Sequence, residues 1–176
     1  MLVSASLLLS SSGVIAKQAD EENALPKDAE SAQAPGHLVV DPELCHGCQA
    51  CMVACSLVHE GRVIPSLARI QIVLDPFEGK HRILYCHQCR RAPCARACPQ
   101  KAIRWIEEGG YWAVDEELCT GCGICVEACP FDAMYLNEER DLAYKCDTCE
   151  GQPVCVQRCP RGALTWEKVE EKEKEG

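Results

Sequence analysis

The cysteines of this chain occur in four runs of four, and no cysteine lies outside a run. There are 16 of them among 176 residues. In chain order, runs one to four are Cys45, Cys48, Cys51 and Cys55; Cys86, Cys89, Cys94 and Cys98; Cys119, Cys122, Cys125 and Cys129; and Cys146, Cys149, Cys155 and Cys159. So regular a distribution indicates a fold organised around these side chains, because thiols that share a metal group must converge in space.

The spacing within the runs is that of iron–sulfur ligands. Runs one and three read C-x2-C-x2-C-x3-C, the spacing that holds 4Fe-4S clusters in bacterial ferredoxins. Runs two and four lengthen the middle gap to four and five residues. Three closely spaced thiolates reach three irons of a cubane cluster, and the fourth iron takes a thiolate from elsewhere in the chain. We therefore expect four 4Fe-4S clusters, which carry electrons.

Two other uses of cysteine fit these runs poorly. Structural zinc sites are typically two C-x2-C pairs separated by a longer loop, whereas these runs are quartets. Disulfide frameworks are typical of small secreted domains, and closely spaced pairs repeated four times would make a poor set of bridges. The pattern therefore favours iron–sulfur clusters over zinc and over disulfides.

The rest of the composition limits the class of protein. Hydrophobic residues make up 47% of the chain, but the cysteines inflate that share, and two Phe, three Trp and four Tyr are few for an ordinary core. We expect the clusters to replace part of the core, so that folding depends on their insertion. The formal net charge is −9 before any thiolate is counted, which argues against nucleic acid as a partner.

The sequence contains an internal duplication. Residues 40–45 match residues 114–119, and a short-gap run followed by a long-gap run occurs twice. A proline that stops the helical turn follows the fourth cysteine of three runs, whereas run one has Ser56 there. These prolines are Pro99, Pro130 and Pro160. The duplication alone leaves open whether run one pairs with run two and run three with run four, or whether the pairing is crossed.

Short strands and single helical turns are expected between the runs. Gly109-Gly110 predicts a hairpin between two of the strands. Residues 51–57 and 125–128 are expected to form single helical turns after the ligand loops. Apolar, β-prone stretches predict strands at 37–40, 69–74, 102–106, 111–114, 134–136 and 163–166.

Two segments lie outside this plan. Residues 1–36 begin small and apolar, but they have neither a basic n-region nor a twin arginine. Their apolar stretch is too short to span a bilayer, so we expect no membrane span and a cytoplasmic location. We expect an extension that contacts a partner subunit or a second copy of the chain, with a solvated tail as the alternative. Residues 167–176, mostly Glu and Lys, are expected to form a charged tail, as a fraying helix.

Over about residues 37–166, the four runs with two lengthened gaps resemble the ferredoxin-type electron-transfer subunits of molybdenum or tungsten pterin oxidoreductases. Within that family, the stretch Cys55-Ser56-Leu57-Val58-His59-Glu60-Gly61, followed by Ala68-Arg69-Ile70, looks most similar to the small subunit of tungsten aldehyde oxidoreductase complexes. Ser56 in place of a proline agrees with this branch.

The resemblance implies an α+β fold of two ferredoxin-like dicluster modules, one inserted in the other, with short strands and helical turns around the clusters. The outer module would comprise residues 37–80 and 140–166, and the inner module residues 81–139. It also implies crossed ligation, in which the fourth cysteine of each run binds another run's cluster. The implied ligand sets are Cys45, Cys48, Cys51 and Cys159; Cys146, Cys149, Cys155 and Cys55; Cys86, Cys89, Cys94 and Cys129; and Cys119, Cys122, Cys125 and Cys98.

A non-catalytic subunit of an oxidoreductase complex is the function expected. Each set supplies four thiolates and leaves no iron open to a substrate. The expected partners are a large catalytic tungsten- or molybdenum-pterin subunit and a flavin or NAD subunit or another electron carrier. The alternatives are a free polyferredoxin shuttle, the β subunit of a formate dehydrogenase or DMSO reductase-type enzyme, and a scaffold whose clusters serve stability alone.

The histidines do not form a convincing catalytic site. His46 and His87 lie inside ligand loops, where each would either donate a hydrogen bond to a cluster sulfur or be an ordinary exposed loop residue. His59 and Glu60 are expected on a turn, with a structural or interface role.

Overall fold

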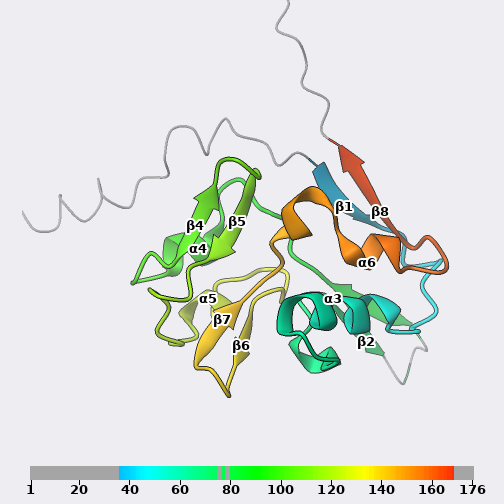
Figure 1. Cartoon of the computed structure of the whole chain (residues 1–176), viewed down its shortest axis with the longest axis horizontal. Helices are drawn as coiled ribbons and strands as arrows, with labels where there is room; N and C mark the ends of the chain where they lie inside the picture. The colour runs from blue at the N-terminus through cyan, green and yellow to red at the C-terminus, as the bar shows by residue number, and fades with distance from the viewer. Residues whose placement is uncertain (1–35, 75–76, 78–79, 169–176) are drawn as a thin grey trace, which may run out of the picture.

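The computed structural model describes residues 36–74, 77 and 80–168, which form short helices and strands joined by the cysteine-bearing loops (Figure 1). The elements in chain order are β1 (Gly36–Val40), α3 (Ala50–Glu60), the 3-10 helix η1 (Pro65–Leu67), β2 (Gln71–Leu74), β3 (His81–Leu84), α4 (Pro93–Ala97), β4 (Ile103–Ile106), β5 (Tyr111–Val114), α5 (Ile124–Glu127), β6 (Tyr135–Asn137), β7 (Leu142–Tyr144), the 3-10 helix η2 (Thr148–Gly151), α6 (Val154–Gln157) and β8 (Leu164–Lys168).

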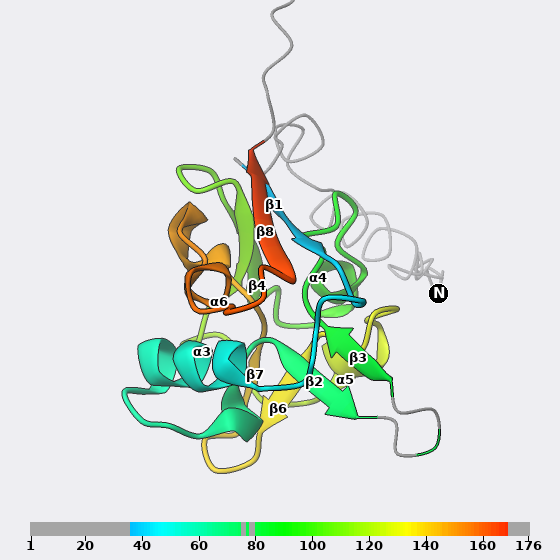
Figure 2. The same cartoon turned by 90° about the vertical axis from the view of Figure 1, so that its right-hand side faces the viewer.

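Within the described residues the strands pair as four antiparallel two-stranded sheets. Three of them are hairpins of consecutive strands, β2–β3, β4–β5 and β6–β7. The fourth joins the two ends of the described chain, with Gly36 of β1 opposite Lys168 of β8 and Val40 opposite Leu164. Figures 1 and 2 both show β1 running alongside β8, and α6 lying beside α3. The two ends of the described chain are therefore joined in one sheet.

Two clusters of buried residues divide the cysteine runs between them. One, which we call the central core, consists of Ala92, Cys94, Ile103, Trp112, Cys125, Met134 and Ala143. The other, which we call the terminal core, consists of Cys51, Met52, Cys55, Ala68, Ile70, Cys155 and Leu164. The cysteines packed in or against the central core belong to runs two and three, and those of the terminal core to runs one and four.

All six expected strands are confirmed, with shifts of at most two residues at their ends. The hairpin at Gly109-Gly110 is confirmed as β4–β5, and the backbone N–H of Gly110 donates to the Ile106 carbonyl at 2.8 Å. Strands β3 and β7 are additions that the sequence did not predict. Each is short and pairs with a predicted strand. The strand conformation of these residues therefore depends on pairing with that neighbour rather than on their own hydrophobic pattern.

Helix α3 is where the expectation of a single turn is wrong. It runs for 11 residues, past the fourth cysteine of its run, and ends at Gly61 in the left-handed conformation. The other runs have a proline after the fourth cysteine, and helices α4, α5 and α6 all end before that cysteine. Ser56 keeps its backbone N–H and carries no ring, so nothing stops the helix there. Its buried Oγ donates to the Val53 carbonyl and accepts from the Ile64 N–H, both at 3.1 Å.

The observed strands cross the segment boundaries expected from the sequence. Hairpins β2–β3 and β6–β7 cross the boundaries drawn after residues 80 and 139. Glu167 and Lys168, expected in a fraying helix, lie in strand β8, because β1 supplies hydrogen-bond partners there. Residues 1–35 and 169–176 lie outside the described residues. No helix among the described residues is both long enough and apolar enough to cross a bilayer.

Candidate metal centres

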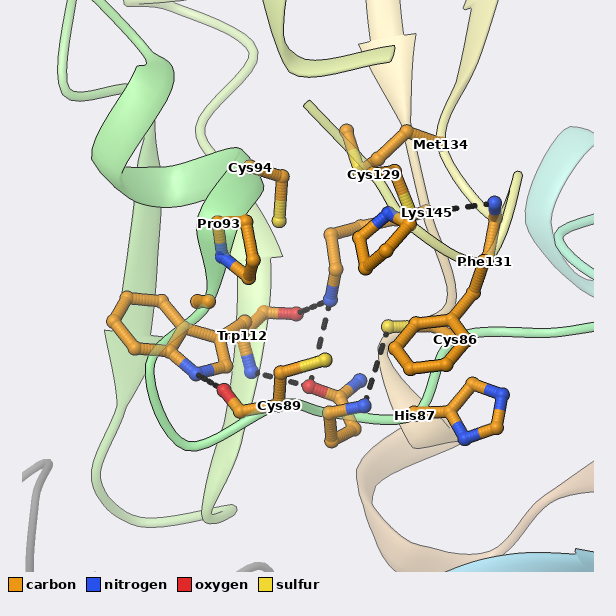
Figure 3. Close-up of a pocket in the computed structure, with 14 residues that line it drawn as sticks. Cys86, His87, Cys89, Pro93, Cys94, Trp112, Cys129, Phe131, Met134 and Lys145 are labelled. Carbon is orange, nitrogen blue, oxygen red and sulfur yellow. Dashed lines mark hydrogen bonds between the residues drawn. The ribbon is translucent and has the colours of Figure 1, made fainter. Parts of the chain in front are cut away.

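A cavity in the central core is lined by three cysteines of run two and one of run three. Cys86, Cys89, Cys94 and Cys129 surround it. Figure 3 shows the ligand loop, helix α4 and the loop after α5 contributing these thiols from different sides, with Lys145 reaching in among them. The cavity therefore draws its fourth thiol from another run.

Two further cavities repeat this composition. One is lined by Cys45, Cys48 and Cys51 with Cys159 of run four. Another is lined by the first three cysteines of run three together with Cys98 of run two. The same lining in all three cavities, three thiols from one run and the last cysteine of another, indicates that each accommodates the same kind of group.

The remaining four thiols converge at the junction of α3, η2 and α6. Burial and, to a smaller extent, the neighbouring Cys149 and Cys55 thiols together raise the pKa of Cys155 to about 12. Burial also raises the pKa of Cys146, where Cys86 and Cys155 are neighbours. The structure thus brings together the last cysteine of run one and the first three of run four. The binding of clusters by the sixteen thiols stays a prediction.

Backbone N–H groups donate to several of these sulfurs. Ala102 and Ala133 donate to Cys98 and Cys129, each four residues earlier, at 3.4 Å. In run one α3 continues past Cys55, and the donor is Arg69, fourteen residues later, at 3.2 Å. Similar bonds reach Cys86, Cys119 and Cys146. Such donors stabilise a thiolate and raise the reduction potential of a cluster that it binds.

The donor set fits an iron–sulfur cluster. Each set is four soft sulfur ligands, which suit Fe–S clusters better than hard cations. Burial raises the pKa of three thiols in separate sets to about 11, so in the cluster-free chain they are protonated at neutral pH. These are Cys51, Cys94 and Cys125. Binding a cluster must therefore release protons.

The histidines occupy different environments. His46 and His87 are both exposed, and His87 is stacked between Tyr85 and Phe131 with ring centroids 4.3 and 3.9 Å away. His59 lies in the last turn of α3, and its Nε2 is 3.6 Å from both the Cys149 Sγ and an Asp147 carboxylate oxygen. The expected turn at His59 is thus helical.

Side chains that the sequence did not single out surround the thiols. Asp147 accepts from Arg69 Nη1 at 2.5 Å and from the Cys149 backbone N–H at 3.0 Å. Lys145 and Gln88 lie between the first cavity and Cys146. A lysine directly before a cysteine run was a possible signal, but it looks the same in sequence as a solvated surface lysine.

Among solved structures, the chain is similar to the active-site complex BamBC of benzoyl coenzyme A reductase bound to benzoyl-CoA. The likeness has 28% sequence identity and a TM-score of 0.44, and covers 78% of this chain and 82% of that chain.

Among proteins of known function, three similar proteins carry names of redox complexes. The polyferredoxin-like subunit of aliphatic sulfonate oxidoreductase from Pyrococcus furiosus is 43% identical over 93 residues, 53% of either chain. The thiosulfate reductase electron transfer subunit PhsB from Salmonella typhi is 36% identical over 61% of this chain and 58% of its own. Polysulfide reductase of Wolinella succinogenes has a component that is 36% identical over 62% of this chain and 60% of its own. The chain thus spans between 53% and 60% of the length of these relatives.

Two domain families match the sequence itself. The 4Fe-4S binding domain matches residues 38–56, which include all four cysteines of run one. The 4Fe-4S dicluster domain matches residues 81–169, just over half of the chain, which include all of runs two, three and four. The chain has 4Fe-4S ferredoxin-like domains, is homologous to electron-transfer subunits of oxidoreductases, and belongs to the 4Fe-4S dicluster domain family.

Proposed function

We propose that this chain is a non-catalytic electron-transfer subunit that carries four 4Fe-4S clusters, held by the four crossed ligand sets. The observation that supports the proposal is that three cavities each bring together three thiols of one run and the last cysteine of another, while Cys55 and Cys149 are neighbours of Cys155 in the fourth set. Such clusters accept and donate single electrons. Each set has four thiols, so no coordination position is left for a substrate.

We propose further that the chain forms two dicluster modules, one inserted in the other. The central core contains only cysteines of runs two and three, and the terminal core only those of runs one and four. The pairing of β1 with β8 brings the two ends of the described chain to the same module. These contacts support an inner module near residues 81–139 and an outer module from residues 37–80 and 140–166, linked through two hairpins.

The neighbours of the thiols give an order for the four sites. Cys51 and Cys155 are both buried in the terminal core, which supports the run-one and run-four sets lying side by side there. Cys86, Cys146 and Cys155 line one further pocket, which supports the run-four and run-two sets being adjacent. Runs two and three share the central core. The order is therefore run one, run four, run two, run three.

The two sites at the ends of this order are the open ones. Cys48 of run one and Cys122 of run three are the two exposed cysteines, whereas the remaining fourteen are buried or partly buried. A group bound near the surface lies closer to an external donor or acceptor. The run-one and run-three sites are accordingly the two points of electron exchange with partners.

The proposed partner is a catalytic subunit with a tungsten or molybdenum pterin, of the aldehyde oxidoreductase type, in the cytoplasm, with a flavin or NAD subunit or another carrier at the other end. The support is the residue pattern at 55–61 and 68–70, together with relatives named as parts of thiosulfate and polysulfide reductases. A free polyferredoxin is the competing function, and the relative named polyferredoxin-like is itself named as a subunit.

Anaerobic purification of the chain from its native host tests both parts of the proposal. Metal analysis should give about sixteen irons per chain, four for each cluster, and mass spectrometry should find a larger pterin-containing chain in the same particle. About eight irons, or stoichiometric zinc, would refute the four clusters. Sixteen irons on a chain that migrates alone would refute the partner and establish the free carrier.

A further inference from the structure

Lys145 is a buried cation at the junction of the two cores. Its residue is only 3% exposed, and it directly precedes Cys146, the first cysteine of run four. Its side chain reaches into the cavity formed by run two and Cys129 (Figure 3). The backbone of Lys145 is thus next to the run-four set, while its side chain lies in the cavity of the run-two set.

The hydrogen-bond partners of the Lys145 ammonium are all neutral oxygens. Its Nζ donates to the backbone carbonyls of Trp112 at 2.5 Å and Cys146 at 3.0 Å, and lies 3.4 Å from the Gln88 side-chain oxygen. None of these is a carboxylate. A buried ammonium without a negative partner is costly, because removing its charge from water is not offset by a counter-charge.

The negative charge that Lys145 requires is available from the thiols around it. Lys145 lines the same cavity as Cys89 and Cys94, and its Nζ donates to the backbone carbonyl of Cys146. Two of these thiols belong to the run-two set and one to the run-four set. A single cation therefore faces two sets of ligands that become anionic when they bind clusters.

We propose that Lys145 is the shared counter-charge of the run-two and run-four clusters, and that it raises the reduction potential of both. This rests on the proposed four-cluster function. Reduction adds one electron to a cluster, and no bond forms and no proton is transferred. The reduced form therefore carries one more negative charge than the oxidised form. A fixed cation nearby stabilises that form and leaves distant clusters unaffected.

Gln88 holds this cation in place and links the two ligand loops. Its side-chain amide donates to the Cys146 carbonyl at 2.7 Å, and its side-chain oxygen accepts from the Trp112 N–H at 2.9 Å. The run-two loop, strand β5 and the start of run four are thereby tied around the ammonium. Gln88 acts through Lys145 and is a positioning residue.

The test compares three variants of the full chain with the wild type in its native assembly. Lys145→Met removes the charge at similar length, Lys145→Gln removes it but keeps a hydrogen-bond donor, and Lys145→Arg keeps it. Arg82→Gln is the matched control, because Arg82 is an exposed cation paired with Asp132 at 3.3 Å. Iron content and EPR-monitored anaerobic redox titration are measured for each. The wild-type iron content tests the proposed function separately, before any variant is compared.

In the neutral variants we expect two of the four clusters to become harder to reduce. At a fixed potential their reduced-to-oxidised ratio should fall at least tenfold, equivalent to about 59 mV for a one-electron couple. The other two clusters, and all four in Arg82→Gln, should keep their midpoints, and Lys145→Arg should restore most of the shift. Loss of the run-two cluster in both neutral variants but not in Lys145→Arg would also support the counter-charge.

Three results would overturn the proposal. The first is four clusters with unchanged midpoints in Lys145→Met and Lys145→Gln. The second is an equal shift of all four clusters, which a general change of fold would cause. The third is cluster loss in all three variants including Lys145→Arg, which would make Lys145 a packing residue.

Discussion

The central core is built from one stretch of chain, whereas the terminal core joins two stretches that are far apart in sequence. The buried residues of the central core all lie between Ala92 and Ala143, and no residue of the terminal core comes from this stretch. Those of the terminal core come from 51–70 and from 155–164. Bringing distant stretches together costs conformational entropy that grows slowly with the length of the loop between them. The terminal core therefore depends more on specific contacts between its two parts.

The described residues show those additional contacts. Strand β1 pairs with β8 along five residues, and Arg69 forms an ion pair of 2.5 Å with Asp147 across the two stretches. Helix α3 has 11 residues, against four or five in α4, α5 and α6. It reaches far enough for His59 to contact Asp147 and Cys149. The comparison teaches that a core built from two distant stretches is held together by a long helix and by pairing of the end strands, whereas a core built from one stretch has only short helices.

The largest expected effect is loss of a cluster from one core when its exchanged cysteine is changed. Cys129→Ser should remove or convert the cluster of run two, and Cys159→Ser that of run one, with up to about four of sixteen irons lost. EPR of Cys129→Ser should then lack the same signal as Cys89→Ser. If Cys129→Ser instead shares its missing signal with Cys122→Ser, each run closes its own cluster and the two-core assignment is wrong.

The pH dependence of cluster retention should be the next largest effect. Burial raises the pKa of Cys155 to about 12 and of Cys55 and Cys94 to about 11, from 9.0. Cluster binding needs thiolates and releases protons, so more iron should remain against a chelator at pH 8.5 than at pH 7.0. Greater retention at the lower pH would contradict this.

The cluster-free fold should respond to pH in the opposite direction. Because the folded thiol pKa is raised, unfolded thiols ionise first as pH rises above 9.0, and the cluster-free fold loses stability between there and about 11. The slope is at most about 1.4 kcal/mol per pH unit for each such thiol. Circular dichroism of the cluster-free chain from pH 8 to 11 measures it. The terminal core, which contains Cys51, Cys55 and Cys155, should lose hydrogen-exchange protection first.

The cysteine pattern predicted the chemistry of the chain, and local patterns predicted much of its secondary structure. Paired glycines and β-branched or aromatic residues were sufficient for β4 and β5, because a hairpin is a local structure. Strands β3 and β7 were missed because His81–Leu84 and Leu142–Tyr144 are short and mixed in polarity.

The contacts around the thiols could not be predicted in the same way. His59 and Asp147 are 88 positions apart, and they meet where the last turn of α3 lies against the start of η2. The sequence showed that run one has Ser56 where the other runs have a proline. The length of the helix that Ser56 permits, however, depends on what the helix packs against. The burial of Lys145 depends on the cavity of another run. These are tertiary effects, which override local preference.

Ser56→Pro should weaken the terminal core by interrupting α3. A proline inside a helix removes a backbone hydrogen bond and clashes with the carbonyl four residues earlier, at a cost of about 3 kcal/mol or more. The control is Ser56→Ala, which keeps the helix and loses only the two Oγ hydrogen bonds, for about 1–3 kcal/mol. Thermal unfolding of the cluster-loaded chain compares the two. Equal destabilisation would show that helix length is not what holds this core together.

The smallest expected effect separates two glycines, one in a ligand loop of the central core and one beside the terminal core. Gly121 and Gly162 have nearly the same left-handed backbone, with φ of 65° and 66°. Alanine in that conformation costs roughly 1–2 kcal/mol, so both variants should lose this much. A Cβ at Gly121 would in addition lie 2.3 Å from the Asp141 carbonyl oxygen, whereas at Gly162 it would meet nothing within 4 Å.

Because the Asp141 oxygen belongs to the backbone, a Cβ at Gly121 would force the β6–β7 turn to shift, and the adjacent run-three loop would shift with it. Thermal unfolding should therefore rank Gly121→Ala below Gly162→Ala, and the run-three EPR signal should broaden only in Gly121→Ala. Equal unfolding temperatures and unchanged signals would mean that the loop and the turn move apart freely, and that the central core is less tightly built than its continuous chain suggests.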